Sequence, residues 1–157
     1  IAGMLGGAMD VVHVDSSRTA LQIGKSNYED NQILINTRSF NHLPVNDFLR
    51  FARKRKDSFD TIIIDPSPPP LSFRTSDEIL NYYARPIQKC LEILKPNGQI
   101  LVSCHSFNDF TPDQFTEALI QIVGNISCDQ TIYFPNEFAI DTPKMFVFIP
   151  KPIQTIN

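Results

Sequence analysis

The feature that most constrains the fold is a repeated switch between strand-like and helix-like spacing of apolar residues. The strand-like segments are 11–14, 33–35, 61–64 and 100–104, and the helix-like segments are 17–27, 45–56, 75–94 and 111–124. Two more strand-like segments follow near 131–134 and 145–149. Alternation of this kind predicts an α/β fold, in which a mostly parallel sheet is covered by helices on both faces.

Two of the helix starts carry a capping box, in which a Thr side chain and an acid or amide three residues later satisfy each other's backbone N–H groups. The first is Thr75 with Glu78, and the second is Thr111 with Gln114, where Pro112 occupies the first helical position. These patterns predict helices that begin at residues 76 and 112.

The length of 157 residues predicts a single domain over residues 1–157. No apolar run reaches the roughly 20 residues of a membrane helix, so we expect no membrane association. A net charge of −3 argues against a uniformly basic nucleic-acid coat. The three cysteines, Cys90, Cys104 and Cys128, allow no closed disulfide framework and fit no zinc spacing. We therefore expect no metal site and a reducing, cytoplasmic setting.

Ligands of such folds bind at the carboxyl ends of the strands, so the residues that follow each strand are the candidates for chemistry. Asp15 ends the first strand, where a carboxylate can accept both hydroxyls of a nucleoside ribose. Capping of the next helix by Asp15, Ser16 or Ser17 explains the same residues. Asp65 ends the third strand and is followed by four prolines in the next five positions, an unusual sequence for a plain turn. We expect Asp65 to contact a substrate on a wall stiffened by Pro66.

Cys104 ends the fourth strand and is a candidate nucleophile, provided that a neighbouring group lowers its thiol pKa. The alternative is a small buried apolar residue, the usual state of a free cysteine. A run of cations, Arg50, Arg53, Lys54, Arg55 and Lys56, has two interpretations as well. It suits contacts with RNA phosphates, and it also suits a solvated helix end that the helix dipole favours.

Taken together, these segments resemble class I S-adenosylmethionine-dependent methyltransferases. The matching segments are 10–17 (DVVHVDSS), 59–66 (FDTIIIDP), 90–104 (CLEILKPNGQILVSC) and 141–146 (DTPKMF). Within the class, the chain is most similar to the ribosomal RNA large-subunit methyltransferases of the 5-methylcytosine type. The resemblance implies a Rossmann-like fold with a closing antiparallel hairpin. It also implies methyl transfer from S-adenosylmethionine to RNA, with ribosomal RNA as the partner.

The resemblance also implies a role for each candidate residue. Asp15 would hold the cofactor ribose, with Ser16 beside it. The acid expected to hold the adenine amine falls on Pro44, so Asp47 is its shifted substitute. Asp65 and Pro66 would line the pocket of the target base, and Cys104 matches the nucleophile that adds to the base's C6. Relatives that methylate guanine do not need that thiol.

The family's first strand and its Gly-rich loop are absent before Ile1, so we expect an N-terminally truncated domain with a gap in its sheet. An upstream segment or a second copy of the chain would then complete the sheet. Two alternatives stay open. One is a degenerate, non-catalytic methyltransferase-like module that binds RNA or protein. The other is a nicotinamide-dependent oxidoreductase, although the sequence lacks a glycine fingerprint for that cofactor.

Overall fold

The computed structural model describes residues 1–36, 38–73, 75–104, 110–133 and 144–151. The chain forms two compact units, Ile1–Arg55 and Lys56–Asn157. The expected single domain over residues 1–157 stays a prediction. No helix within the described ranges is long and apolar enough to cross a membrane.

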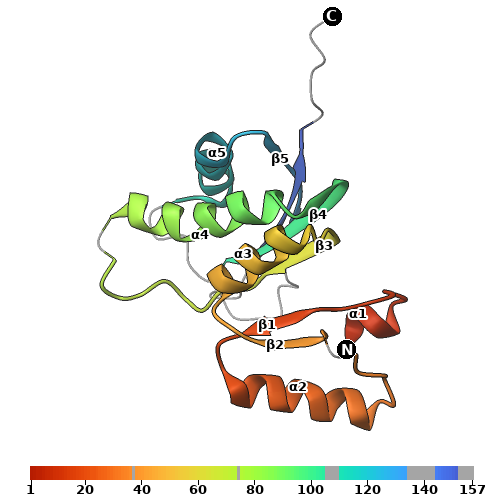
Figure 1. Ribbon diagram of the computed structural model, residues 1–157. Coiled ribbons are helices and arrows are strands. Elements are labelled where there is room, and N and C mark those ends of the chain that lie inside the picture. Colours follow the sequence, from red (N-terminus) through yellow and green to blue (C-terminus); the bar gives the residue numbers. More distant parts are fainter. Residues whose placement is uncertain (37, 74, 105–109, 134–143, 152–157) are drawn as a thin grey trace, which may run out of the picture. The chain divides into compact units, whose positions relative to one another are not determined.

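The first unit is built around a pair of parallel strands. Its elements are α1 (Ala2–Leu5), β1 (His13–Asp15), α2 (Arg18–Asp30), β2 (Phe40–His42) and α3 (Val45–Arg55). The register pairs His13 with Phe40 and Asp15 with His42. Figure 1 shows α2 and α3 on opposite sides of this strand pair, so helices cover both faces here as expected.

The predicted strand at 33–35 is wrong, because β2 is formed by Phe40–His42 instead. Leu34 is 90% exposed, and residues 33–35 belong to no strand or helix. Phe40 lies against the ring of His13, with the ring centroids 4.7 Å apart, and meets the ring of Tyr28 edge-on at 5.1 Å. Packing of this aromatic side chain therefore decides which segment pairs with β1.

We expect His13 to make the stability of this unit depend on pH. Its Nε2 atom lies 2.8 Å from the hydroxyl oxygen of the buried Tyr28, and desolvation by burial lowers the pKa of His13 below 6.5. The unfolded chain therefore binds more protons than the folded chain just below that pH, so stability rises with pH. We expect the free energy of unfolding to fall as the pH drops through about 6.5, and the His13→Gln variant to lose part of this slope. Equal slopes in urea titrations of both proteins would contradict this role of His13.

The second unit is a four-stranded sheet with two helices. Its elements are β3 (Phe59–Ile64), α4 (Ser76–Leu91), β4 (Leu94–Cys104), α5 (Pro112–Val123), β5 (Ile126–Ile132) and β6 (Lys144–Pro150). The strand order is β3-β4-β6-β5. Both predicted capping boxes are present, at Thr75 with Glu78 and at Thr111 with Gln114.

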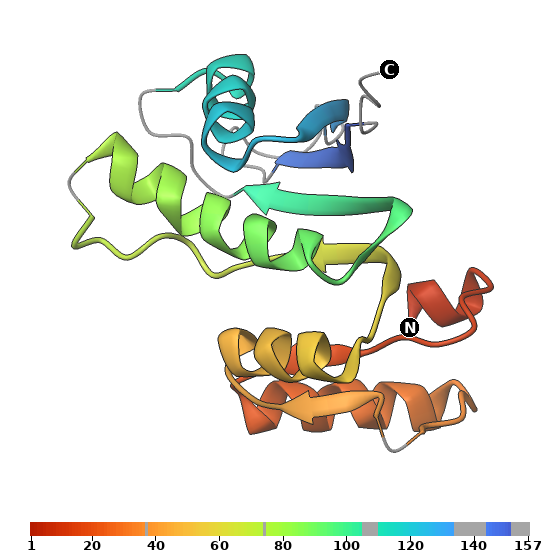
Figure 2. The same ribbon diagram turned by 45° about the horizontal axis from the view of Figure 1, so that its top comes forward.

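The four-stranded sheet is mixed rather than mostly parallel. In the described part of the chain, β1–β2 and β3–β4 are parallel, whereas β4–β6 and β5–β6 are antiparallel. The antiparallel hairpin of β5 and β6 is thus confirmed, and β6 lies between β4 and β5. Figures 1 and 2 show α4 and α5 side by side on one face of this sheet, where Phe115 of α5 packs against Tyr83 and Phe146. The described helices of this unit therefore cover one face instead of two.

Strand β3 lies at an edge of the four-stranded sheet, and the described strands form no pairing between β3 and the β1–β2 sheet. The gap expected from the sequence stays a prediction. The apolar run of β3 predicts a strand buried on both faces, but Ile63 is 64% exposed. The prediction that both faces of β3 are buried is therefore wrong, because β3 is an edge strand with an exposed apolar side chain.

Gly98 allows β4 to approach β3 closely. A Cβ atom at this position would lie 2.9 Å from the carbonyl oxygen of Asp60 and 2.8 Å from the side chain of Leu94. The backbone atom cannot rotate away, so we expect Gly98→Ala to lower the free energy of unfolding by about 1–3 kcal/mol. Asn97→Ala, at the exposed neighbouring position, serves as the control in urea unfolding. Equal stabilities of the two variants would show that the strands can move apart at little cost.

Candidate functional site

Asp15 lies at the carboxyl end of β1 and begins the turn into α2. Its Oδ1 atom accepts a hydrogen bond of 2.6 Å from the backbone N–H of Ser17. Ser17, and not Asp15, is the N-cap of α2, where its Oγ accepts from the N–H of Ala20 at 3.2 Å. An ionised carboxylate accepts about four hydrogen bonds. The exposed Asp15 is therefore held by one bond and retains acceptor capacity for a hydroxyl ligand.

Sequence reasoning missed His42, which ends β2 beside Asp15 in the parallel register. Its Nε2 atom lies 3.0 Å from the carbonyl oxygen of Ser16 and so holds the turn after β1 against the end of β2. Ligand contacts are expected at the ends of strands. Because the sequence predicts the second strand at 33–35, it indicates no contact at His42. His42 is thus a structural neighbour of the predicted ribose site.

Asp47 lies in the first turn of α3, beyond the end of β2. Its carboxylate accepts a hydrogen bond of 3.1 Å from the guanidinium of Arg50. The backbone N–H of Leu43 donates to the carbonyl oxygen of Asp15 at 3.1 Å, which extends the strand pairing towards α3. Asp15, Ser16 and Asp47 therefore all belong to the first unit, near the carboxyl ends of its two strands.

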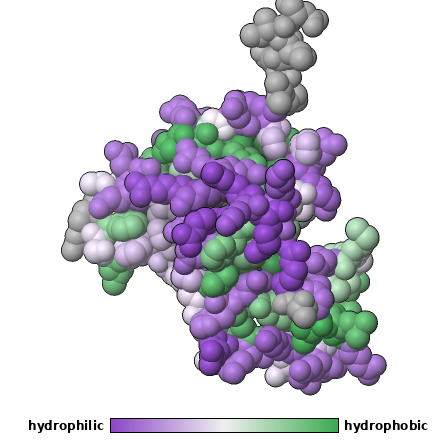
Figure 3. All heavy atoms as spheres, in the orientation of Figure 1, coloured by the Kyte–Doolittle hydropathy of each residue, from purple (hydrophilic) through white to green (hydrophobic). Residues whose placement is uncertain are grey.

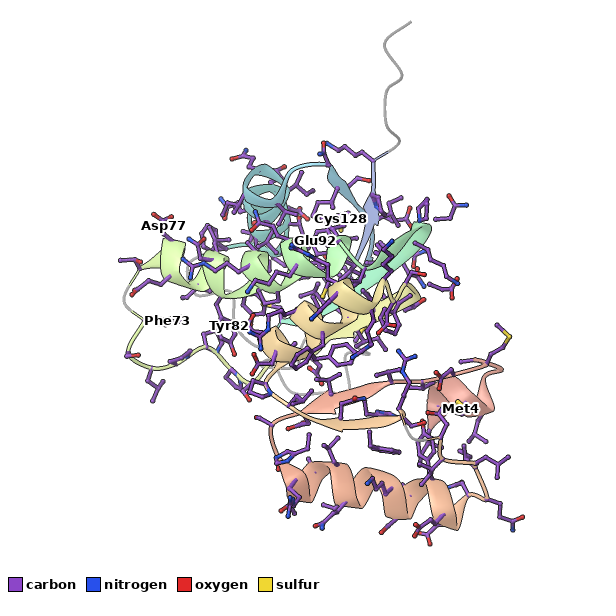
Figure 4. The ribbon with its side chains drawn as sticks, in the orientation of Figure 1. Met4, Phe73, Asp77, Tyr82, Glu92 and Cys128 are labelled. Atoms are coloured by element: carbon purple, nitrogen blue, oxygen red, sulfur yellow. The ribbon has the colours of Figure 1, made fainter. Side chains whose placement is uncertain are left out.

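The loop after β3 carries Asp65 and Pro66 in the second unit. Asp65 is exposed and Pro66 is half-buried. The hydroxyl of Tyr82 on α4 donates a hydrogen bond of 3.0 Å to the carbonyl oxygen of Ser67. Phe73, further along the loop, meets the Tyr82 ring edge-on with the centroids 5.9 Å apart (Figure 4). Sequence reasoning missed the contact of Tyr82 with this loop, because the position of Tyr82 in the sequence indicates only that it belongs to a helix.

Cys104 is the last residue of β4 and is 1% exposed. The parallel register pairs Ile64 with Val102, so the residues that follow Ile64 come to the same edge of the sheet as Cys104. Asp65, Pro66 and Cys104 are thereby brought to one edge. His105 and Ser106, which follow the cysteine, lie outside the described residues.

The other cysteines differ from Cys104 in position. Cys90 is buried on α4, and burial raises its thiol pKa to about 12, as expected of a packing residue. Burial is also the main cause that raises the thiol pKa of Cys128 on β5. Among the residues that the structure describes, no three His, Cys, Asp or Glu side chains are grouped to hold a metal ion.

Comparison with known proteins relates the chain to one reaction class. No protein-family model matches the chain. It is 29% identical over 149 residues to the ribosomal RNA large subunit methyltransferase I of Salmonella arizonae, a match that covers 91% of this chain and 35% of that protein. The corresponding protein of Citrobacter koseri is 28% identical, with 91% of this chain and 36% of that protein covered. The chain is a methyltransferase homologue.

Solved structures agree with this relationship. A protein assigned as a methyltransferase and solved in complex with SAH superposes on this methyltransferase homologue with a TM-score of 0.77 at 26% identity, covering 94% of this chain and 40% of that one. A protein from Streptococcus mutans, assigned as a SAM-dependent methyltransferase, gives the same TM-score at 25% identity and the same coverage. The methyltransferase homologue thus spans about a third of the length of the curated relatives it matches.

Proposed function

We propose that this methyltransferase homologue transfers a methyl group from S-adenosylmethionine to a base of RNA. The observation that carries the proposal is Asp15, whose anchored carboxylate lies at the carboxyl end of β1 in a fold that matches a protein solved with SAH. The relatives named above are methyltransferases of ribosomal RNA, which makes ribosomal RNA the favoured substrate. Bacterial ribosomal RNA is made and modified in the cytoplasm, so we propose the same location for this chain.

The residues at the carboxyl ends of β1 and β2 fit the cofactor's nucleoside. We assign the ribose hydroxyls to the remaining acceptor positions of Asp15, with Ser16 beside them. Asp47 is our candidate for the adenine amine, since a carboxylate that accepts one bond from Arg50 can accept others. When bound, S-adenosylmethionine supplies an electrophilic methyl group.

The second unit supplies the residues that we assign to the target base. We propose that Asp65 and Pro66 contact the base, on a loop that Tyr82 holds through the carbonyl of Ser67. We propose that Cys104, once its thiol proton has been lost to a general base, adds through Sγ to C6 of a cytosine. C5 would then be nucleophilic enough to take the methyl group, with S-adenosylhomocysteine as the leaving group. Transfer of the C5 proton to a general base then allows elimination of Cys104 as its thiolate.

Replacing Asp15 tests the proposed cofactor site. We expect Asp15→Ala to weaken S-adenosylmethionine binding at least about 100-fold, because two hydrogen bonds to a carboxylate are lost. The measurement is a calorimetric titration of the 157-residue chain. Asp30→Ala, at an exposed position near the end of α2, is the control and should bind as the unchanged protein does. Binding that survives in Asp15→Ala, or tighter binding of a nicotinamide dinucleotide, would overturn the proposed site.

The burial of Cys104, which is 1% exposed, favours a second candidate. A nucleophile must reach its substrate, and a buried thiol on a strand is usually a packing residue. The alternative function is therefore a non-catalytic methyltransferase-like module that binds RNA or protein. Transfer of a radioactive methyl group to RNA would exclude this alternative, and cofactor binding without transfer would support it.

A further inference from the structure

The exposed face of helix α3 combines positive charge with an aromatic ring. Five of the 14 lysines and arginines of the chain occur between residues 50 and 56, although the net charge of the chain is −3. All five of these side chains are exposed. Figure 3 shows hydrophilic side chains over much of the visible surface in the region of α3, with an apolar patch among them. We define the α3 face as Arg50, Phe51, Arg53, Lys54 and Arg55.

The packing of α3 accounts for the side on which these cations lie. Phe48, Leu49 and Ala52 are buried, with Ala52 completely inaccessible. At 100° per residue, Arg50 and Lys54 point away from this buried stripe, and they are neighbours because they are four residues apart. Arg50 and Lys54 thus form one positive surface opposite the buried stripe, with Arg53 and Arg55 on its two flanks.

The helix dipole explains only part of the α3 face. It favours cations in the last turn, which holds Arg53, Lys54 and Arg55. It gives no reason for Arg50, which precedes that turn, or for an exposed phenyl ring among the cations. Phe51 is 39% exposed, and the guanidinium carbon of Arg50 lies 5.0 Å from its ring centroid.

The guanidinium of Arg50 lies over the ring of Phe51, and we call this positively charged pair the platform. Aromatic rings and guanidinium planes are the groups on which unstacked bases lie in complexes with single-stranded RNA. Arg50 donates one bond of 3.1 Å to Asp47, and a guanidinium has five N–H donors, so it retains donors for a phosphate. An acidic protein partner would account for the positive charge but not for the exposed aromatic ring beside it.

We propose that the α3 face binds single-stranded RNA, with its cations on the phosphates and a base stacked on the platform of Arg50 and Phe51. The choice of RNA among nucleic acids rests on the proposed function. The charge, the exposure and the ring contact do not depend on it. The α3 face is an RNA contact additional to the residues assigned above to the target base.

The test measures binding of a labelled single-stranded RNA of about 12 nucleotides by fluorescence anisotropy at a series of salt concentrations. In Arg50→Gln/Lys54→Gln, we expect binding at low salt to weaken by about tenfold. The slope of log K against log salt should also become shallower by about 1.4, since each phosphate contact to a single strand contributes about 0.7. Glutamine keeps the helix propensity of both positions.

The matched control is Arg85→Gln/Lys89→Gln, which removes two exposed cations with the same spacing on α4. It should change neither the affinity nor the slope. Phe51→Leu should weaken binding of the single strand by at least about fivefold, and it should leave binding of a duplex of equal length unchanged. Circular dichroism of each variant checks that α3 remains folded.

Three results would overturn the inference: no RNA binding by the unchanged chain at low salt, equal losses in the control pair, or equal slopes in all proteins. Unchanged binding of the single strand in Phe51→Leu would show that no base stacks on the Phe51 ring. Binding of an acidic peptide in place of RNA would identify a protein partner instead. The RNA-binding assay contains no cofactor. A failed S-adenosylmethionine titration would therefore refute the proposed function, whereas RNA binding by the α3 face would still be measured independently.

Discussion

Replacing Phe115 with alanine should lower the free energy of unfolding of the second unit by about 3–5 kcal/mol. The side chain is completely buried, and its ring lies 5.3 Å from Tyr83 and 5.9 Å from Phe146, centroid to centroid. Its loss leaves a cavity between α4, α5 and β6. Because folded domains are stable by only about 5–15 kcal/mol, this one change removes much of the total.

Chemical unfolding followed by circular dichroism measures the effect of Phe115→Ala. Leu71→Ala is the control in the same unit, because Leu71 is 96% exposed and its truncation should cost less than about 0.5 kcal/mol. Similar losses in both variants would mean that the ring stack of Phe115 is not the centre of this core.

Replacing Cys104 with alanine should lower the rate of methyl transfer to RNA by a factor on the order of 10⁴ or more, since the covalent route through the thiolate is removed. The sulfur has a suitable location, at the sheet edge that Asp65 and Pro66 share. The measurement is transfer of a radioactive methyl group from S-adenosylmethionine to RNA.

Cys90→Ala is the matched control for Cys104→Ala, because it removes an equally buried thiol from α4. It should reduce stability without removing transfer. Full activity in Cys104→Ala would exclude the thiol as nucleophile and would favour a guanine-type target, which needs no thiol. A transfer rate of zero in the unchanged protein would instead favour the non-catalytic module.

Helix starts were predictable from the sequence, because the groups that fix them are close together along the chain. Thr75 and Glu78 satisfy each other's backbone groups within one turn, as do Thr111 and Gln114. No distant contact is needed to form such a box. The closing hairpin was predictable from the family resemblance, although β5 begins at Ile126, earlier than the apolar pattern indicates.

The position of β2 was not predictable from local pattern. Residues 33–35 have the better strand composition, but the pairing with β1 goes to Phe40, Asn41 and His42. The deciding contacts of Phe40 are with His13 and Tyr28, from two other elements. Pattern reasoning weighs each segment alone, so tertiary packing of this kind overrides it.

The candidate site was predictable at the level of strand ends and no further. Asp65 and Cys104 come to one edge because the strands before them are parallel neighbours, and the alternating pattern implies that arrangement. The contacts of His42 with the turn after β1, and of Tyr82 with the loop after β3, depend on side-chain directions. Spacing along a sequence contains no such information.

The location of β6 between β4 and β5 affects the order in which the second unit can fold during synthesis. A ribosome produces β4 and β5 first, yet these two strands are not partners and must wait for β6. Until residue 150 has left the exit tunnel, the backbone groups of both strands lack this shared neighbour, and Ile100 and Ile126 lack part of their core. A nascent chain that pauses before β6 would therefore expose two unpaired strand edges, which are the surfaces most prone to aggregation.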